Sequence, residues 1–144
     1  MRALFQKIHE DAILPRQAKT GDAGFDIFSA EDYLIPPGKT CLVNSGWNIH
    51  VGSTDVNIQF NTGTGWATTL WVAKVCSRSG MALKHRVWVA NGPGIIDQSY
   101  NGLLGVILYN GGDKDFVVEK GDRVAQLLFE MVVVPQVAIV TEMP

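Results

Sequence analysis

Short hydrophobic stretches alternate with clusters of glycine, proline and asparagine along most of the chain. The turn-forming clusters recur at short intervals, at residues 36–38, 44–46, 91–94, 110–112 and 120–122. Between them lie runs rich in valine, isoleucine, leucine, phenylalanine and tryptophan, at residues 86–90, 103–109, 116–119 and 124–129. Short β-prone runs bounded by turn residues are typical of all-β proteins. The pattern therefore predicts an all-β sandwich or barrel.

One short helix interrupts this pattern. No segment keeps a helical hydrophobic period over about 11 residues, so long helices are not expected. The segment Ser79–Lys84 is the exception, because Ser79 is a good N-cap and the following Met, Ala, Leu and Lys are strong helix formers. The start of a helix offers free N–H groups to an anion, and Arg78 could add a bidentate contact there.

Length and charge limit the classes of partner. The 144 residues fit one domain, which we expect to span residues 1–144, and the 47% of hydrophobic residues is enough for a packed core. A formal net charge of -2 lacks the basic field that attracts nucleic acids and anionic membranes, so we expect neither partner. No run approaches the ~18–20 hydrophobic residues of a membrane-spanning helix.

Cysteines, histidines and the N-terminal residues exclude several common sites. The N-terminal residues lack the hydrophobic region of a signal peptide, which predicts a cytoplasmic protein. Cys41 and Cys76 lie far apart and are expected to be reduced and buried. His9, His50 and His85 show no zinc-binding spacing. The chain also has no glycine-rich loop of the two standard nucleotide-binding folds.

Five segments combine residue types that chemistry uses. They are 23–30 (AGFDIFSA), 77–85 (SRSGMALKH), 91–97 (NGPGIID), 99–102 (SYNG) and 123–128 (RVAQLL). Taken singly, each has an ordinary structural interpretation. Asp26 fits an outward strand residue, Asp97 the end of a strand, and Tyr100 an aromatic residue at the edge of the core. Arg78-Ser79-Gly80 fits a solvated turn, and Gln126 an outward residue of a half-buried sheet.

The order and spacing of the segments change this interpretation, because together they resemble the trimeric deoxyuridine triphosphate nucleotidohydrolases (dUTPases). Four of the family's five motifs are matched in order, by AGFDIFSA, SRSGMALKH, NGPGIID with SYNG, and RVAQLL. The resemblance covers most of the chain, from the opening HEDAILP to about Phe129. The succession of SRSG, a short strand, NGPGIID and SYNG makes it highly specific.

The resemblance implies a jelly-roll-like β-sandwich with little helix, assembled as a homotrimer whose active sites lie between subunits. Val132–Val140 would suit packing between subunits, although an ordinary core strand explains this segment equally well. The implied reaction is hydrolysis of dUTP to dUMP and pyrophosphate. In the family this reaction keeps uracil out of DNA and supplies dUMP for dTMP synthesis.

The resemblance also implies catalytic roles. Asp97 would orient and deprotonate the attacking water as general base. Mg²⁺ would bridge the phosphate oxygens and offset charge on the leaving pyrophosphate, while Asp26 would hold the water shell of the metal. The phosphates would lie at the start of the short helix and beside the fourth motif, against Arg78, Ser79, Gly80 and Gln126.

Substrate selection would come from the segment between Asn91 and about Gly105. The hydrogen-bonding edge of uracil would be read by the Asn91 side chain and by main-chain groups around Gly94, Ile95, Ile96 and Gly105. A wrong base would leave buried polar groups unpaired, and a tight pocket would exclude the methyl group of thymine. Tyr100 would pack beneath the deoxyribose, where a ribose 2'-hydroxyl would clash.

Three features depart from the family pattern. Ser77 stands where the second motif usually begins with proline, and Asn101 follows Tyr100 where Arg or Gln is common. The family's fifth motif, a glycine-rich C-terminal arm with a phenylalanine that closes over the nucleotide, is not matched. We hypothesise that an insertion at 52–70 replaces this arm, with Gly63, Gly65 and Trp66 forming the lid. The alternative is a surface hairpin loop with one packed tryptophan.

Two other functions compete with this assignment. The related dCTP deaminases share the fold, but they use a glutamate in the third-motif region, and residues 97–102 contain none. A non-catalytic dUTP-binding regulatory protein would explain the unmatched fifth motif. A pure binder would not need Asp97, however, so catalysis is the preferred interpretation.

Overall fold

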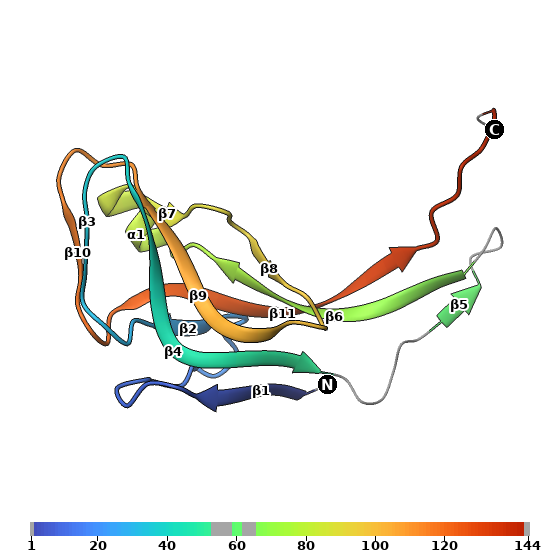
Figure 1. Ribbon diagram of the computed structural model, residues 1–144, viewed down its shortest axis with the longest axis horizontal. Coiled ribbons are helices and arrows are strands. Elements are labelled where there is room, and N and C mark those ends of the chain that lie inside the picture. Colours follow the sequence, from blue (N-terminus) through green and yellow to red (C-terminus); the bar gives the residue numbers. More distant parts are fainter. Residues whose placement is uncertain (1, 53–58, 62–65, 143–144) are drawn as a thin grey trace.

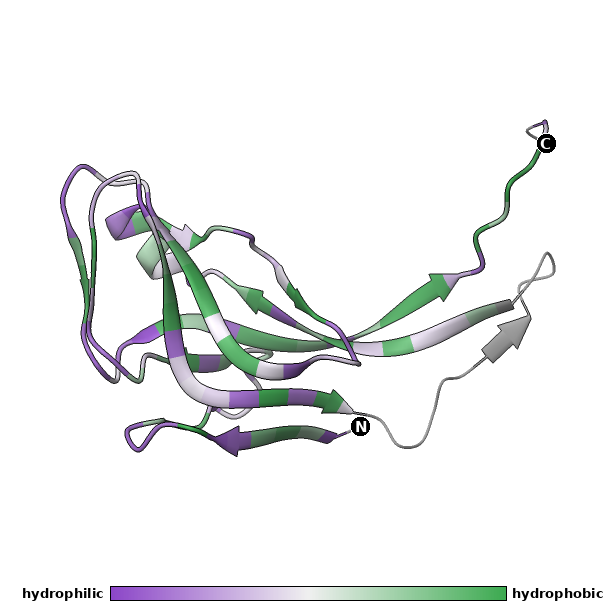
Figure 2. Ribbon diagram, viewed as in Figure 1, coloured by the Kyte–Doolittle hydropathy of each residue, from purple (hydrophilic) through white to green (hydrophobic). Residues whose placement is uncertain are grey.

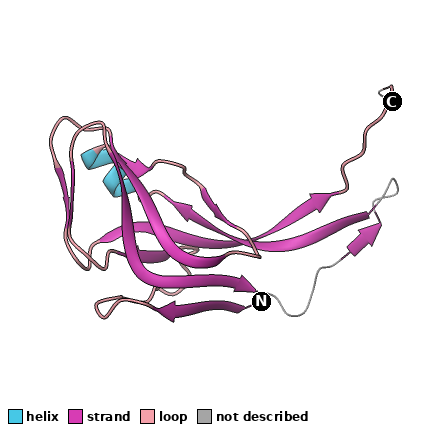
Figure 3. Ribbon diagram, in the orientation of Figure 1, coloured by secondary structure: helices cyan, strands magenta, loops and turns pink. Residues whose placement is uncertain are grey.

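The computed structural model describes residues 2–52, 59–61 and 66–142, with the backbone alone at 59–61 and at 66. Within these ranges the protein is mostly β-structure with one short helix (Figure 3). The strands are β1 Arg2–Lys7, β2 Phe25–Phe28, β3 Tyr33–Ile35, β4 Thr40–Gly52, β5 Gln59–Asn61, β6 Trp66–Cys76, β7 Val87–Val89, β8 Gly94–Ile96, β9 Asn101–Asn110, β10 Phe116–Val118 and β11 Arg123–Pro135. The helix α1 spans Ser79–His85.

Two larger antiparallel sheets and a small ribbon make up the described part of the fold. One sheet has the order β1-β4-β9-β7, and the other has the order β2-β11-β6-β5 with β8 also paired to β6. β3 and β10 form a separate two-stranded ribbon. In Figure 1, α1 lies between this ribbon and β7, while β6 and β11 extend together beyond β1 and β4 towards β5.

The core lies between the two larger sheets. Val43, Leu104 and Leu108 of the first sheet and Val75 and Leu127 of the second belong to one cluster of buried side chains. Residues two apart on a strand face the same side, so these positions define the inner face of each sheet. Residues between them, such as Gln126 and Leu128, face outward from the second sheet. The alternation therefore separates a core face from a face that can carry polar chemistry.

The expected strands and helix are confirmed, with longer or shifted ends. The run at 103–109 belongs to β9, and the run at 124–129 continues to Pro135 in β11. The N-cap prediction was wrong, since Arg78 occupies the N-cap and Ser79 is already the first helical residue. The backbone of Arg78 is extended, as at an N-cap, so the helix begins one residue earlier than the side-chain preference of serine indicated.

The C-terminal hydrophobic segment does not behave as a core strand in this chain. β11 ends at Pro135, and beyond its paired part the side chains of Val137, Ile139 and Val140 are largely exposed. Figure 2 colours the outer part of β11 and the following segment as hydrophobic, although they extend away from the body. The core-strand interpretation of Val132–Val140 is therefore wrong for these residues. In the described part of the chain, no helix is long and apolar enough to span a membrane.

Both cysteines are free in the structure. Cys41 lies in β4 and Cys76 at the end of β6, and each side chain is half-buried rather than fully buried. Burial raises the pKa of the Cys41 thiol above its usual value, which favours the protonated, unreactive form.

Candidate functional site

The third-motif residues line a pocket between β8 and β9, which we call the hairpin pocket. Its volume is about 360 Å³, and its lining residues are Leu42, Val75, Asn91, Gly94, Ile95, Ile96, Tyr100, Leu103, Gly105 and Ile107. All six residues that the sequence assigned to base and sugar recognition are in this set. β8 pairs with β6, and β9 pairs with β4, so both walls of the pocket belong to the main sheets.

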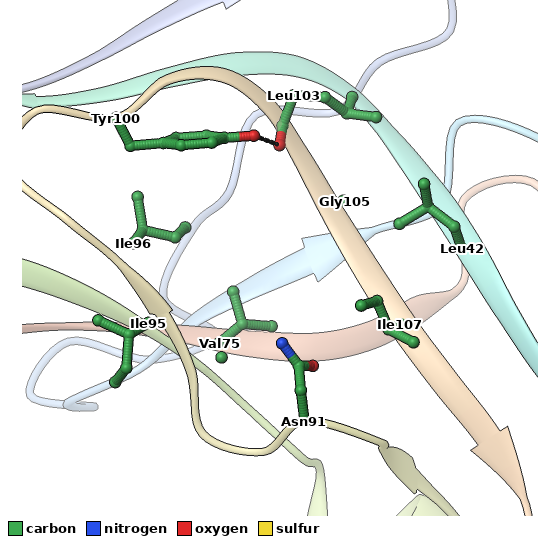
Figure 4. A pocket seen from close by; sticks show the side chains of 10 residues that line it. Leu42, Val75, Asn91, Ile95, Ile96, Tyr100, Leu103, Gly105 and Ile107 are labelled. Carbon is green, nitrogen blue, oxygen red and sulfur yellow. Dashed lines mark hydrogen bonds between the residues drawn. The ribbon is translucent and has the colours of Figure 1, made fainter.

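Few polar side chains reach the hairpin pocket. In Figure 4, Asn91 projects into it from the loop after β7, while the Tyr100 ring lies across the pocket and its hydroxyl donates a 2.8 Å hydrogen bond to the Leu103 carbonyl. The backbone comes close at Gly105, because a Cβ there would lie 2.7 Å from Cδ1 of Leu42. Such a pocket offers one amide side chain and main-chain groups against apolar walls, which suits a flat heterocycle.

Residues of the first, second and fourth motifs line a second pocket, which we call the arginine pocket. It also has a volume of about 360 Å³, and it is lined by Ala18, Asp22, Ala23, Gly24, Asp26, Arg78, Ser79, Gly80, Arg123, Gln126 and Leu128. Antiparallel pairing of β2 with β11 places Asp26 directly opposite Gln126. Gln126 donates through Nε2 to the Ser77 carbonyl at 3.1 Å, which joins the fourth motif to the second.

Two guanidinium groups surround one carboxylate in the arginine pocket. Nε of Arg78 and Nη1 of Arg123 each lie 3.2 Å from an oxygen of Asp26. Nη1 of Arg78 also donates to the Arg123 carbonyl at 3.0 Å. Asp26 faces outward from β2 on the same side as Gln126, but only 14% of its side chain is exposed because it lies within the arginine pocket. The two guanidinium groups exceed the one carboxylate that they surround by one positive charge, which suits an anion with several charged oxygens.

A single chain does not bring the two pockets together. Val75 lines the hairpin pocket, whereas Gln126 and Leu128 line the arginine pocket. Gln126 pairs with Cys76, the residue next to Val75, so Val75 and Gln126 point to opposite faces of the sheet. Within the described residues, the groups expected to bind the base and those expected to bind phosphate are therefore divided by the β6–β11 layer.

Asp97 lies in a third depression, which we call the Asp97 hollow. Its lining residues are His50, Gly52, Leu70, Val72, Asp97, Gln98 and Ser99. Asp97 starts the turn that joins β8 to β9, and the amide of Tyr100 donates to its carbonyl at 3.0 Å. The side chain of the expected general base is exposed and lines neither the hairpin pocket nor the arginine pocket.

The hypothetical lid remains untested. Gly63 and Gly65 lie outside the described residues, and Trp66 is described only as the first backbone position of β6. β5 pairs with the start of β6, with Gln59 opposite Thr68 and Asn61 opposite Trp66, so part of the 52–70 insertion forms a strand pair.

Several lining residues were not identified from the sequence. Arg123 opens the RVAQLL motif, so its position in a matched family motif could have indicated an anion contact beside Arg78. Asp22 lies just before the first motif, so motif matching indicates it less strongly than Arg123. Leu42 reaches the hairpin pocket from β4, some distance along the sequence, and only the antiparallel pairing of Leu42 with Ile107 brings it there.

Comparison with known proteins identifies the family and the fold of the chain. Residues 10–144 match the dUTPase family model. The deoxyuridine 5'-triphosphate nucleotidohydrolase of Clostridioides difficile is 42% identical over 123 residues, which cover 85% of this chain and 75% of that protein. The corresponding protein of Oryza sativa is 38% identical over 138 residues, covering 96% and 70%. The dUTPase structure from phage phi11 of S. aureus superposes with a TM-score of 0.81 at 21% identity and covers 99% of this chain and 98% of that one. The chain therefore belongs to the dUTPase family.

Proposed function

We propose that the protein hydrolyses dUTP to dUMP and pyrophosphate. The observation that carries this proposal is that the chain has two pockets of different chemistry. One pocket is apolar with a single amide side chain, and the other contains two arginines. This pair of pockets matches a substrate that has a flat base at one end and a triphosphate at the other. Family membership and relatives named as deoxyuridine 5'-triphosphate nucleotidohydrolases support the same reaction, and they give no support to deamination or to binding without turnover.

Uracil would bind in the hairpin pocket. The Asn91 amide and main-chain groups near Gly94 and Gly105 would pair with its polar edge, while the apolar walls exclude water. Tyr100 would lie against the deoxyribose. Its ring is fixed by the hydrogen bond from its hydroxyl to Leu103, so it leaves little freedom to accommodate an added 2'-hydroxyl.

The triphosphate would bind in the arginine pocket. Arg78 and Arg123 would exchange part of their contact with Asp26 for phosphate oxygens, and Ser79 and Gly80 would add contacts at the start of α1. Positive charge fixed near the leaving group stabilises the charge that develops there in the transition state. The same groups would bind the pyrophosphate product.

The arginine pocket also fits Mg²⁺ held largely by substrate and water. Mg²⁺ prefers oxygen ligands and usually keeps several waters, using one or two carboxylates together with substrate phosphates. Asp26 and Asp22 supply carboxylates at this pocket, and no group of three or more metal-ligating side chains gathers among the described residues to form a closed cage. When bound, the ion would neutralise charge on the phosphates. A structural Mg(II) ion is described in a phage phi11 dUTPase, and a phage 80alpha dUTPase has been solved with dUPNHPP.

Asp97 would serve as the general base. Its exposed carboxylate can accept a proton from a water molecule that attacks the α-phosphorus. In one chain this carboxylate lies in the Asp97 hollow rather than with the arginines. A homotrimer, in which the third-motif turn of one subunit meets the arginine pocket of another, would complete the site. The exposed hydrophobic residues Val133, Val137 and Ile139 would also be covered by such assembly.

Pyrophosphate release tests the proposed reaction directly. The chain is incubated with Mg²⁺ and, separately, dUTP, dTTP, dCTP and UTP, and pyrophosphate is measured against time. We expect release from dUTP, far slower release from the other three, and loss of activity when a chelator removes the metal. Ammonia release from dCTP would instead establish deamination, and tight dUTP binding without release would establish a binding protein.

The role of Asp97 is tested by Asp97→Asn, which keeps the size and exposure of the side chain. We expect turnover to fall by roughly 10³-fold because a positioned general base contributes about 10²–10⁴-fold. Binding of a non-hydrolysable dUTP analogue should remain close to that of the wild type. Unchanged turnover would show that another group takes the proton.

A further inference from the structure

Tyr100 is held at three of its atoms, and one of these contacts comes from outside the turn. Its amide donates to the Asp97 carbonyl at 3.0 Å, and its hydroxyl donates to the Leu103 carbonyl at 2.8 Å. Both contacts are internal to the segment 97–103. The third contact joins the Tyr100 carbonyl to Nδ1 of His50, on β4, at 3.0 Å. Since a carbonyl only accepts, Nδ1 must carry the proton.

This side-chain contact attaches the turn to the sheet at a point where the backbone pairing between β4 and β9 has already ended. The register between β4 and β9 ends with His50 opposite Asn101. The next residue back along the chain from Asn101 is Tyr100, which has no partner in that register. The imidazole of His50 reaches this residue and holds its carbonyl, so the turn that carries Asp97 is fixed to β4 as well as to β9.

We propose that His50 is a positioning residue for the reaction, which acts by fixing the turn that bears Asp97 and Tyr100. The inference rests on the proposed function. His50 lines neither the hairpin pocket nor the arginine pocket, so it is not placed to touch the base or the phosphates. It lines the Asp97 hollow, whereas Tyr100 lines the hairpin pocket. Its effect on turnover must therefore pass through the turn.

Gly52 gives the imidazole the room that this contact requires. A Cβ at residue 52 would lie 2.8 Å from Nε2 and 3.0 Å from Cδ2 of His50, closer than ordinary contact allows. The backbone of Gly52 pairs with Arg2 in the β1–β4 ladder and has no positive φ, so alanine suits the backbone there. Gly52→Ala would thus displace the ring from the position in which it contacts the Tyr100 carbonyl, while leaving histidine at residue 50.

The inference predicts an effect on turnover rather than on substrate binding. A misplacement of about 1 Å in a catalytic group can cost about 10²-fold in rate, and loss of one exposed tether permits a smaller shift. We expect His50→Ala to lower kcat by about tenfold while the KM for dUTP stays within about twofold, because the two substrate pockets keep their residues.

Four variants of the full chain test the proposal with dUTP and Mg²⁺. His50→Asn retains an N–H donor near the position of Nδ1 and should restore most of kcat. Gly52→Ala should reproduce the loss of kcat expected for His50→Ala. The double variant, His50→Ala with Gly52→Ala, should lose no more kcat than either single variant, since both substitutions remove the same contact. Asn48→Ala is the matched control, because it removes an exposed β4 hydrogen bond to Gln6 that does not involve the turn.

The outcomes separate this inference from the proposed function. Absence of dUTP turnover in the wild type overturns the proposed function and the inference with it. Normal turnover in the wild type, with His50→Ala no different from Asn48→Ala, overturns the inference alone. A loss in His50→Ala that is shared by His50→Asn, or that appears as lower thermal stability with unchanged kcat, also contradicts it. Rescue by asparagine together with a matching loss in Gly52→Ala supports it.

Discussion

The hairpin pocket and the arginine pocket have about the same volume, but their walls differ in chemistry. The hairpin pocket is formed mainly by β8 and β9 with apolar side chains, and its one amide side chain, Asn91, lies beside main-chain groups. The arginine pocket is formed by side-chain charges, with Asp26 between Arg78 and Arg123. The first is shaped by backbone geometry, whereas the second is held in its present form by ion pairs that a ligand can replace.

This difference indicates how selectivity and rate are divided. Hydrogen-bonding groups and walls of fixed shape discriminate between substrates, because a wrong group is left unpaired or clashes. Charges near the phosphates cannot distinguish one base or sugar from another, but they stabilise the transition state of all nucleotides alike. We therefore expect substitutions in the arginine pocket to lower all rates together, and substitutions in the hairpin pocket to change their ratios.

Among substitutions in the two pockets, the largest effect is expected from Arg78→Ala. Removal of this guanidinium should lower kcat/KM for dUTP by about 10²–10³-fold, the range found when one transition-state donor is removed. The ratio of dUTP to UTP turnover should stay the same. Lys84→Ala, which removes an exposed cation from the same helix, serves as control in steady-state pyrophosphate assays. A changed dUTP-to-UTP ratio in Arg78→Ala would break the comparison.

A smaller effect is expected from Asp26→Asn. The amide keeps the shape of the carboxylate but removes the charge that would hold the hydrated metal ion, so the Mg²⁺ concentration for half-maximal rate should rise about tenfold. Titration of pyrophosphate release against Mg²⁺ measures this shift. An unchanged Mg²⁺ requirement would mean that Asp26 serves only to pair Arg78 and Arg123.

The smallest effect on dUTP itself, but a clear effect on selection, is expected from Tyr100→Ala. Loss of the ring should reduce the preference for dUTP over UTP by about tenfold, since space opens where a 2'-hydroxyl would lie. Tyr100→Phe keeps the ring but removes the bond to the Leu103 carbonyl that fixes it, so its preference should fall between those of the Ala and wild-type proteins. Competition assays with both nucleotides give the ratio. Equal preferences in the Ala and wild-type proteins would remove the sugar-selecting role from Tyr100.

The two pockets also differ in how far the sequence could predict them. The fold class and α1 follow from local patterns, since turn residues and hydrophobic runs act over a few positions. Asp26, Arg78 and Gln126 were identified through motif order, and strand pairing between β2 and β11 explains why they meet. Leu42 and His50 carry no local signal, because only the register of β4 against β9 brings them to the third-motif segment.

The placement of Asp97 shows a further limit of the sequence. Motif order groups Asp97 with the phosphate-binding residues, but the β6–β11 layer and the turn after β8 hold them apart in one chain. The sequence specifies each strand or helix and its residues. How two copies of the chain pack against each other depends on exposed surfaces, and no single motif describes these surfaces. Contacts between copies would form at the exposed side chains of Val133 and Val137.

Subunit complementation tests the central claim, that hairpin and arginine pockets of different chains form one site. Asp97→Asn and Arg78→Ala proteins, each nearly inactive alone, are unfolded together, refolded as a mixture and assayed for dUTP hydrolysis. If sites form between copies in a symmetric oligomer, random mixing should give about a quarter of wild-type activity, because that share of sites receives both intact halves. If each chain contains a complete site, the mixture should be no more active than the separate variants, which would contradict the account.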